Sequence, residues 1–157
     1  MEGVIIPIKK PVPVSNLQIL SRASFFLRLT PGQLDLVAAN CSVQEFPATS
    51  QIYSLGDSAK YFYVLVEGMV RFNLTLGNRQ TSVGEILRRG EVFGWAALIE
   101  GAQRRAATAS CITPCVVLAL EGNRLIEAME RDHGLGYFLM KQLNILINGK
   151  MIGFVAG

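Results

Sequence analysis

The sequence contains few of the residues on which metal and disulfide chemistry depend. Its 157 residues include one histidine, His133, and three cysteines. One histidine cannot build a multi-histidine metal centre, and an odd number of cysteines gives no disulfide framework. We therefore expect reduced, buried thiols, a cytoplasmic location and no metal site.

The motifs of nucleophilic catalysis and nucleotide hydrolysis are also missing. The chain has no Gly-x-Ser-x-Gly elbow, no cysteine beside a credible base and no Walker motif. His133 lies near an expected helix end, where a histidine commonly interacts with the helix dipole. We predict that the protein is not an enzyme, with no catalytic residue and no cofactor.

Long hydrophobic runs and dense charge are absent as well. The most apolar stretch, 135–155, is interrupted by polar residues such as Lys141, which argues against a membrane span. The first eight residues contain Glu2 and Pro7, and the apolar run between these two residues is too short for a signal peptide. A net charge of +3 is small for a nucleic-acid-binding surface. We expect neither a membrane nor a nucleic acid as a partner.

Apolar residues, in contrast, are abundant. Half of the chain is hydrophobic and the mean hydropathy is +0.34. The length suggests one domain with a sizeable core. The hydrophobic excess is high for a soluble monomer and favours an apolar surface that is covered either by a partner or by a neighbouring part of a longer chain.

Turn residues and hydrophobic periodicity divide the chain into helix, then strands, then helix. Residues 7–16 contain three prolines and indicate an extended arm, whereas 17–26 are compatible with a short helix. Thr30-Pro31-Gly32-Gln33 predicts a helix start with Thr30 as the N-cap and Gln33 three residues later.

Short apolar runs separated by glycines follow from residue 43 onward. The expected strands are 43–46, 51–53, 61–67, 69–75, 80–87, 108–111 and 115–120. Closely spaced short strands with glycine turns are typical of a β-sandwich or jelly roll. The predicted fold class is therefore mainly β, a jelly roll or β-roll of about eight strands with N-terminal and C-terminal helices.

Helical periodicity returns after Glu121. Leu125, Ile126 and Met129 share one helical face, and a second helix is expected from about residue 134 to 154. We divide the chain into an N-terminal arm with a short helix at 1–29, a β-roll domain at 30–133 and a C-terminal helix at 134–157.

The segment from Gly90 to Ile99 is the most informative part of the sequence. A turn with Gly94 opens a short apolar helix, whose free N–H groups form an anion site that a phosphate can approach closely. The pair Arg104-Arg105 then leads into a strand of small residues. Arg105 can clamp a phosphate with its planar guanidinium, whereas Arg104 is expected to face solvent because neighbours in a strand point to opposite faces.

These residues resemble the phosphate-binding cassette of cyclic nucleotide-binding domains. The cassette reads roughly Phe-Gly-Glu-x-Ala-Leu, a short loop, and then Arg-Ala-Ala-Thr. The matching residues are Phe93, Gly94, Ala97, Leu98, Arg105, Ala106, Ala107 and Thr108. The resemblance implies a cyclic nucleotide-binding-like β-roll over 30–133.

A second segment is similar to the sequence that these domains carry upstream. It consists of Ile52-x-x-x-Gly56-Asp57 followed by the run from Phe62 to Val70. In the family the Gly-Asp pair closes a turn, and the later glycine, here Gly68, joins two strands of the barrel. The likeness therefore extends from about residue 30 to the final helix.

The resemblance implies a ligand-binding set that includes one divergent position. Trp95 stands where the family has the glutamate that binds the ribose. Three interpretations of Trp95 stay open: it packs in the core, it stacks on a sugar or base, or it covers the mouth of the pocket. The implied ligand-binding residues are Phe93, Gly94, Trp95, Ala96, Ala97, Arg105 and Ala106.

The function implied is that of a non-catalytic sensor for cAMP, cGMP or a similar phosphate-bearing ligand. One alternative is a ligand-free interaction module, and another is the sensor part of a transcription regulator that lacks its DNA-binding domain. The helix at 134–157 is expected to form a homodimer or to cover the ligand. We expect no base-reading helix-turn-helix after it.

Overall fold

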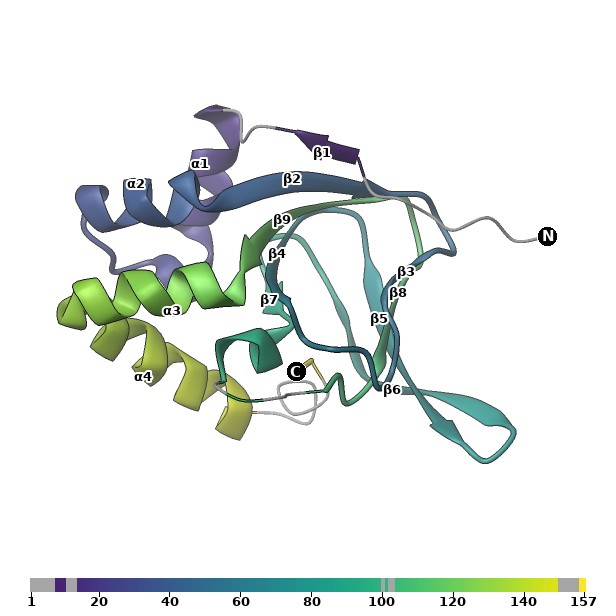
Figure 1. Ribbon diagram of the computed structural model, residues 1–157. Helices are drawn as coiled ribbons and strands as arrows, with labels where there is room; N and C mark the ends of the chain where they lie inside the picture. Colours follow the sequence, from purple (N-terminus) through teal and green to yellow (C-terminus); the bar gives the residue numbers. More distant parts are fainter. Residues whose placement is uncertain (1–7, 11–13, 100, 102–103, 150–155) are drawn as a thin grey trace.

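Antiparallel strands form a roll, and helices gather along one side of it (Figure 1). The computed structural model describes residues 8–10, 14–99, 101, 104–149 and 156–157. The strands of this part of the chain are β1 Ile8–Lys10, β2 Cys41–Phe46, β3 Gln51–Tyr53, β4 Tyr61–Glu67, β5 Val70–Leu76, β6 Arg79–Leu87, β7 Val92–Phe93, β8 Thr108–Cys111 and β9 Cys115–Glu121. The helices are α1 Val14–Arg22, η1 Ser24–Phe26, α2 Pro31–Ala39, η2 Trp95–Leu98, α3 Gly122–Arg131 and α4 His133–Gly149.

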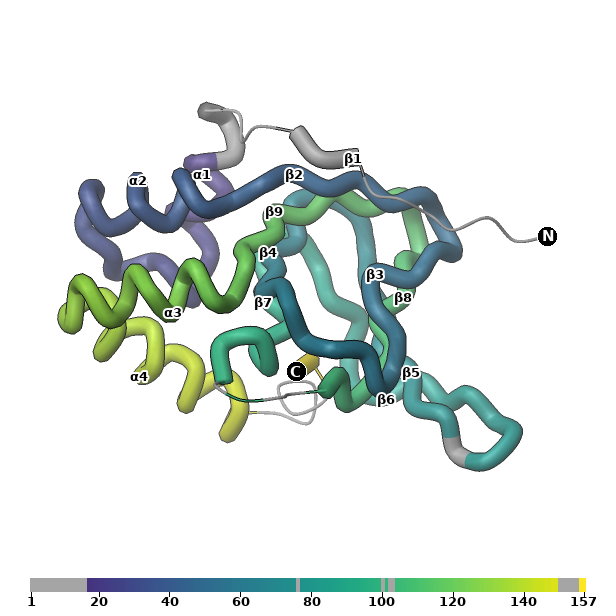
Figure 2. The backbone as a smooth tube through the Cα atoms, viewed as in Figure 1, coloured from purple at the N-terminus to yellow at the C-terminus, as the bar shows by residue number. Residues whose placement is uncertain are grey.

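Two sheets face each other across the roll. One has the strand order β1-β2-β9-β4-β7 and the other the order β3-β8-β5-β6, and every described pair is antiparallel. Strands β2 and β9 lie side by side although about seventy residues separate them in the sequence (Figure 2). The predicted fold class, a jelly roll flanked by helices, is confirmed.

Strand β4 shows how one element serves two cores. Because successive side chains of a strand point to opposite faces, Phe62 and Val64 pack against the helices, while Tyr63 and Leu65 point into the roll. All four side chains are buried. This explains why the strand has a continuous apolar run instead of an alternating one.

The helical layer begins with the capping box that the sequence predicts. The Thr30 hydroxyl accepts from the Gln33 N–H at 3.2 Å, and the Gln33 side chain accepts from the Thr30 N–H at 3.1 Å. At the other end of the chain, α4 buries Leu135, Leu139 and Leu143, which lie four residues apart on one face. None of the helices in the described residues is long and apolar enough to cross a membrane.

The N-terminal helix differs from the expectation of a single helix over 17–26. Helix α1 starts earlier, at Val14, and an extended residue, Ala23, separates it from the short helix η1. The break allows Phe25 and Phe26, which are adjacent, both to be buried against Phe62. Of the expected arm at 7–16, residues 8–10 form strand β1, and residues 7 and 11–13 lie outside the described residues.

The end of the chain differs from the expected helix as well. Helix α4 is described to Gly149, and the expected continuation over 150–155 lies outside the described residues. Ala156 lies in a turn and Gly157 has no regular structure. The prediction of a helix that reaches residue 157 is therefore wrong for these two residues, because they enter the roll instead.

Candidate functional site

The Gly56–Asp57 turn holds the main chain of Arg105 in place. The Gly56 N–H donates to the Arg105 carbonyl at 3.0 Å, and the Arg105 N–H donates to the Asp57 carbonyl at 2.9 Å. The Asp57 carboxylate closes the turn by accepting from the Ser54 N–H at 2.9 Å. The Gly-Asp pair noted in the sequence thus positions an arginine about fifty residues later in the chain.

The side chain of Arg105 lies inside the roll with 3% of its surface exposed. Its Nη2 donates to the Tyr61 carbonyl at 2.6 Å. The guanidinium carbon lies 4.2 Å from the centre of the Tyr53 ring and 5.9 Å from that of Tyr63, within cation–π range. Within the described residues, the Arg105 Nε–H has no hydrogen-bond partner.

Arg105 is a buried cation that pairs directly with no acidic side chain in the described residues. In the described part of the chain, no aspartate or glutamate side chain forms an ion pair with its guanidinium. Burial lowers the pKa of Arg105, and the nearby Tyr53, Tyr63 and Asp57 oppose this shift. An arginine nevertheless stays protonated in proteins. A desolvated positive charge without an anionic side chain beside it favours the binding of an anion.

The tyrosines beside Arg105 remain neutral at physiological pH. Burial raises the pKa of Tyr63 to about 12, although the Arg105 charge acts in the opposite direction. Burial likewise raises the pKa of Tyr53 above its usual value. Both phenols are therefore protonated, and the Tyr53 hydroxyl can donate a hydrogen bond into the site.

Gly94 brings the start of helix η2 against Arg105. Its φ of 77° lies in the left-handed region that favours glycine. A Cβ at this position would lie 2.9 Å from the Tyr61 carbonyl oxygen, 3.0 Å from Tyr63 Cδ2 and 3.1 Å from Arg105 Nη1. The absence of a side chain therefore allows the helix start and the guanidinium to lie against each other.

Ala156 and Gly157 lie directly against Gly94 and Arg105. The Gly94 N–H donates to the Ala156 carbonyl at 2.5 Å, and Arg105 Nη1 donates to the Gly157 main-chain oxygen at 3.1 Å. The Tyr53 hydroxyl lies 3.5 Å from the Ala156 carbonyl oxygen. Figure 1 shows the C-terminus beside the short helix that follows β7, at the lower end of the roll.

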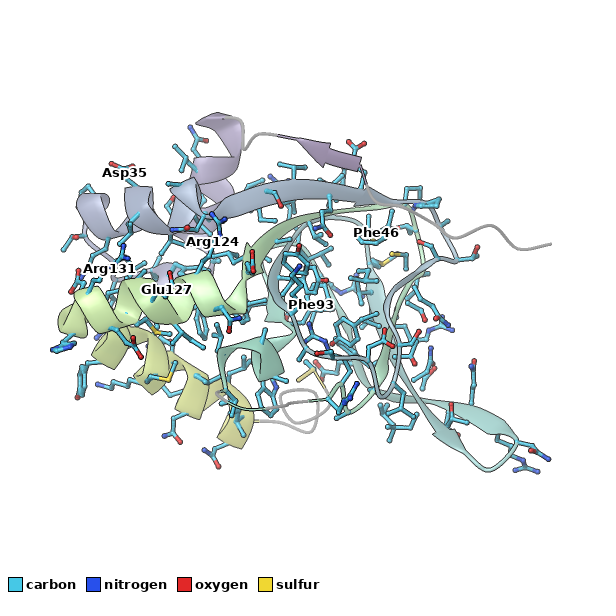
Figure 3. The ribbon with its side chains drawn as sticks, viewed as in Figure 1. Asp35, Phe46, Phe93, Arg124, Glu127 and Arg131 are labelled. Atoms are coloured by element: carbon cyan, nitrogen blue, oxygen red, sulfur yellow. The ribbon has the colours of Figure 1, made fainter. Side chains whose placement is uncertain are left out.

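The remaining predicted site residues lie in the neighbouring elements β7 and η2 and in the segment after Arg105. Phe93 is fully buried inside the roll and stacks on Tyr63 with ring centres 5.0 Å apart (Figure 3). Ala96 and Ala97 are buried in η2, where the Ala97 carbonyl faces Gly122 at the start of α3. Ala106 is half-buried beside Arg105.

Trp95 contacts both the core and the candidate site. Its half-buried side chain packs against the helical core and against the interior of the roll. A Cβ added to Gly157 would lie 2.6 Å from Cζ2 of the Trp95 ring. The ring therefore forms the wall against which the last residue of the chain lies.

The two adjacent arginines have different environments, as the sequence predicts. Arg104 is exposed, and its Nη1 donates to the Gly56 carbonyl at 3.3 Å. Sequence reasoning missed the tyrosines at 53, 61 and 63 and the pair Ala156–Gly157. The inward position of Tyr63 follows from strand alternation, but the use of the Tyr61 carbonyl and of the chain end has no sequence signal.

A second groove carries charges but none of the predicted site residues. It lies between α2 and α3 and has a volume of about 540 Å³. Arg124, Glu127 and Arg131 project from α3 toward α2 there (Figure 3). Its mixture of acidic and basic side chains does not favour a ligand of either charge.

Comparison with known proteins relates the fold and the site to one family. The family model "Cyclic nucleotide-binding domain" matches residues 43–132. A putative cyclic nucleotide-binding protein from Geobacter metallireducens is 28% identical, with a TM-score of 0.70 over 80% of this chain and 89% of that one. The catabolite activator protein of Thermus thermophilus is 26% identical, with a TM-score of 0.67 over 76% of this chain and 56% of that one.

The fold is also shared with a more distant sensor domain. The sensor domain of the transcriptional regulator DNR from Pseudomonas aeruginosa is 20% identical, with a TM-score of 0.72 over 85% of this chain and 89% of that one. At this identity the likeness shows the fold alone.

Because neighbouring atoms approach Gly94 closely, we predict that adding a methyl group there lowers the free energy of unfolding more than at other glycines. Gly90 is the matched control, because its φ is 87° and a Cβ there would meet nothing within 4 Å. Gly90→Ala should lower the free energy of unfolding by about 1–2 kcal/mol, the cost of the left-handed conformation. Gly94→Ala should lose a further 1–3 kcal/mol or so through overpacking. Urea denaturation measures both, and equal losses would contradict the close packing around Gly94.

Proposed function

Because the chain belongs to the cyclic nucleotide-binding domain family, we propose that it is a non-catalytic sensor of a cyclic nucleotide or a similar phosphate-bearing ligand. The observation that carries the proposal is the buried Arg105 guanidinium, whose Nε–H lacks a partner among the described residues. A buried polar group without a partner is costly. A phosphate oxygen would satisfy it and would balance the charge.

Three kinds of donor converge on the proposed phosphate position. Arg105 supplies a planar guanidinium, and Gly94 supplies a main-chain N–H at the start of η2. Tyr53 adds a neutral hydroxyl at the same place. These donors are suited to the oxygens of a phosphate diester, and none of them is a nucleophile or a general base at neutral pH. The proposed role is therefore binding without catalysis.

The sugar side of the proposed site differs from the family pattern. In place of the family's glutamate, Trp95 presents an apolar ring. A carboxylate there would accept a charge-assisted hydrogen bond from the ribose 2′-hydroxyl, worth about 1.5–3 kcal/mol. Without it, this chain would bind a cyclic nucleotide roughly ten to a hundred times more weakly than a site that has the glutamate.

The sensor part of a transcription regulator is a second candidate. One structural neighbour is described as the sensor domain of a transcriptional regulator, and the match to the catabolite activator protein covers only 56% of that protein. The regulator candidate specifies what the sensor controls. It would bind its ligand at the same site around Arg105. A ligand-free interaction module is the alternative if the site binds no nucleotide.

The first test of the proposal concerns the adjacent arginines. Arg105→Ala should abolish binding of cAMP and cGMP, because it removes the guanidinium that would clamp the phosphate. Arg104→Ala should leave the affinity within about twofold, because Arg104 is exposed outside the pocket. Isothermal titration calorimetry on the full chain measures both.

A conservative variant separates a lost ligand contact from a damaged fold. Arg105→Lys keeps a positive charge but loses the planar fork, and its folding is checked by thermal denaturation. A folded Arg105→Lys or Arg105→Ala protein that binds cyclic nucleotides as tightly as the wild type would refute the assignment.

The second test concerns the divergent position in the cassette. If Trp95 replaces a lost ribose acceptor, Trp95→Glu should raise the affinity for cAMP or cGMP by about tenfold or more. The 2′-deoxy nucleotide should gain less, because it has no hydroxyl to donate. Comparing both nucleotides on both proteins separates a ribose contact from a general opening of the pocket. An equal change for the two nucleotides would count against the lost-acceptor interpretation.

The exposed face of α4 supports a further part of the proposal, a homodimer. The side chains of Tyr137 and Ile145 are 71% and 56% exposed. Beside them, an apolar groove of about 470 Å³ runs between η2, α3 and α4, lined mainly by Leu98, Ile99, Ile126, Met129, Tyr137 and Met140. An apolar face of this kind marks an interaction surface.

Light scattering on the intact chain tests the homodimer. The wild type should have the mass of a dimer, and Tyr137→Glu should shift it toward the monomer because it places a charge in the interface. Leu27→Glu is the control, since Leu27 is an apolar residue outside α4 with a similar exposure of 63%. A monomeric wild type at high concentration would rule out the dimer.

A further inference from the structure

The pocket around Arg105 is occupied by the protein's own main chain. We infer that the segment Ala156–Gly157 is a tethered occupant of the phosphate site, which a ligand has to displace before it can bind. The inference rests on the proposed function, because it concerns the regulation of the same site. It does not depend on which nucleotide the site takes.

The segment uses the donors that we assign to the phosphate. The Ala156 carbonyl accepts from the Gly94 N–H at 2.5 Å, and the Gly157 main-chain oxygen accepts from Arg105 Nη1 at 3.1 Å. Two successive main-chain oxygens therefore take the places of two phosphate oxygens. Because one N–H group cannot serve both partners at full strength, the segment and a phosphate exclude each other.

The packing around the segment is as close as that of the core. Ala156 is 2% exposed and belongs to the hydrophobic cluster inside the roll. Gly157 is buried against the Trp95 ring, where a Cβ would lie 2.6 Å from Cζ2 and 2.7 Å from Cε2. Only glycine fits between this ring and Arg105. The divergent tryptophan thus forms an apolar wall for this main-chain segment, where a glutamate would repel the main-chain oxygens.

The segment Ala156–Gly157 leaves one hydrogen-bond donor of Arg105 without an acceptor in the described part of the chain. Arg105 Nε–H stays without a partner among the described residues while the segment is bound. A phosphate presents more oxygens than the segment does, so it can also accept from the Arg105 Nε–H, and its bonds to the guanidinium are strong charge-assisted hydrogen bonds. A ligand can therefore displace the segment. The segment competes from within the same molecule, so it reduces the apparent affinity at any protein concentration.

Substitution of Gly157 tests the inference in the full-length chain. Gly157→Leu cannot fit against Trp95 and should expel the segment. Gly149→Leu is the matched control near the same end of the chain, because Gly149 is exposed and a Cβ there meets nothing within 4 Å. Ala156→Glu is a second expelling variant, since Ala156 is buried among apolar groups.

The first measurement reports the segment itself without any nucleotide. Hydrogen exchange of the Gly94 amide, followed by NMR, should become at least about tenfold faster in Gly157→Leu and Ala156→Glu, because the bond to Ala156 is lost. The rate in Gly149→Leu should match that of the wild type. Unchanged Gly94 exchange in both expelling variants would overturn the inference, whatever the nucleotide affinities.

The second measurement reports competition. Calorimetry should show that cAMP or cGMP binds about tenfold or more tightly to Gly157→Leu than to the wild type, and that Gly149→Leu resembles the wild type. Faster Gly94 exchange with unchanged affinity would refute the competition. Faster exchange with no nucleotide bound by any variant would refute the proposed function, and would support the segment as the occupant of the site.

Discussion

The burial of one guanidinium group is the interaction on which the site depends. Arg105 lies inside the roll between the carbonyl of Tyr61 and the ring of Tyr53, at the distances expected for a hydrogen bond and a cation–π contact. Three separate parts of the chain hold it there: the Gly56–Asp57 turn, strand β4 and the start of η2. A desolvated cation is costly to bury unless it is paired. The same cost favours an anion as the partner of this guanidinium.

The site is connected to the helices through contiguous packing. Helix η2 starts at Gly94 in the pocket, and its Ala97 carbonyl lies against Gly122 at the beginning of α3. Helix α3 in turn meets α4 at Gly136. A Cβ added to Gly136 would lie 3.0 Å from the Met129 carbonyl oxygen. No side chain separates the elements at either contact. A shift of η2 would therefore be transmitted to α3 and α4, the helices that carry the exposed apolar face.

Local patterns in the sequence predict the fold well but the site only in part. Alternation and glycine turns locate the strands, and the Thr30–Gln33 spacing locates the start of α2, because these signals act over a few residues. The order of Phe93, Gly94 and Arg105 indicates the cassette, since the family carries the same spacing. The tyrosines at 53 and 61 escaped notice because one contributes a ring face and the other a main-chain carbonyl. Neither contribution depends on a motif.

The chain end was beyond sequence reasoning for a different reason. The sequence predicts a C-terminal helix over 134–157, yet Ala156 and Gly157 leave the helix and lie against Gly94 and Arg105. Their placement depends on contacts with Gly94 and Arg105, more than fifty residues away, and periodicity carries no information on such contacts. The break within 17–26 has a similar origin, because the burial of Phe25 and Phe26 against Phe62 overrides local helix preference.

The NMR signal of the Arg105 Nε–H group tests the central claim most directly. This group has no acceptor among the described residues, so it reports the arrival of a ligand oxygen. When cAMP or cGMP is added to the full-length protein, the Arg105 Nε–H resonance should move downfield and its exchange with water should slow, while that of Arg104 stays unchanged. Saturation of the protein with nucleotide while the Arg105 resonance does not move would contradict the account.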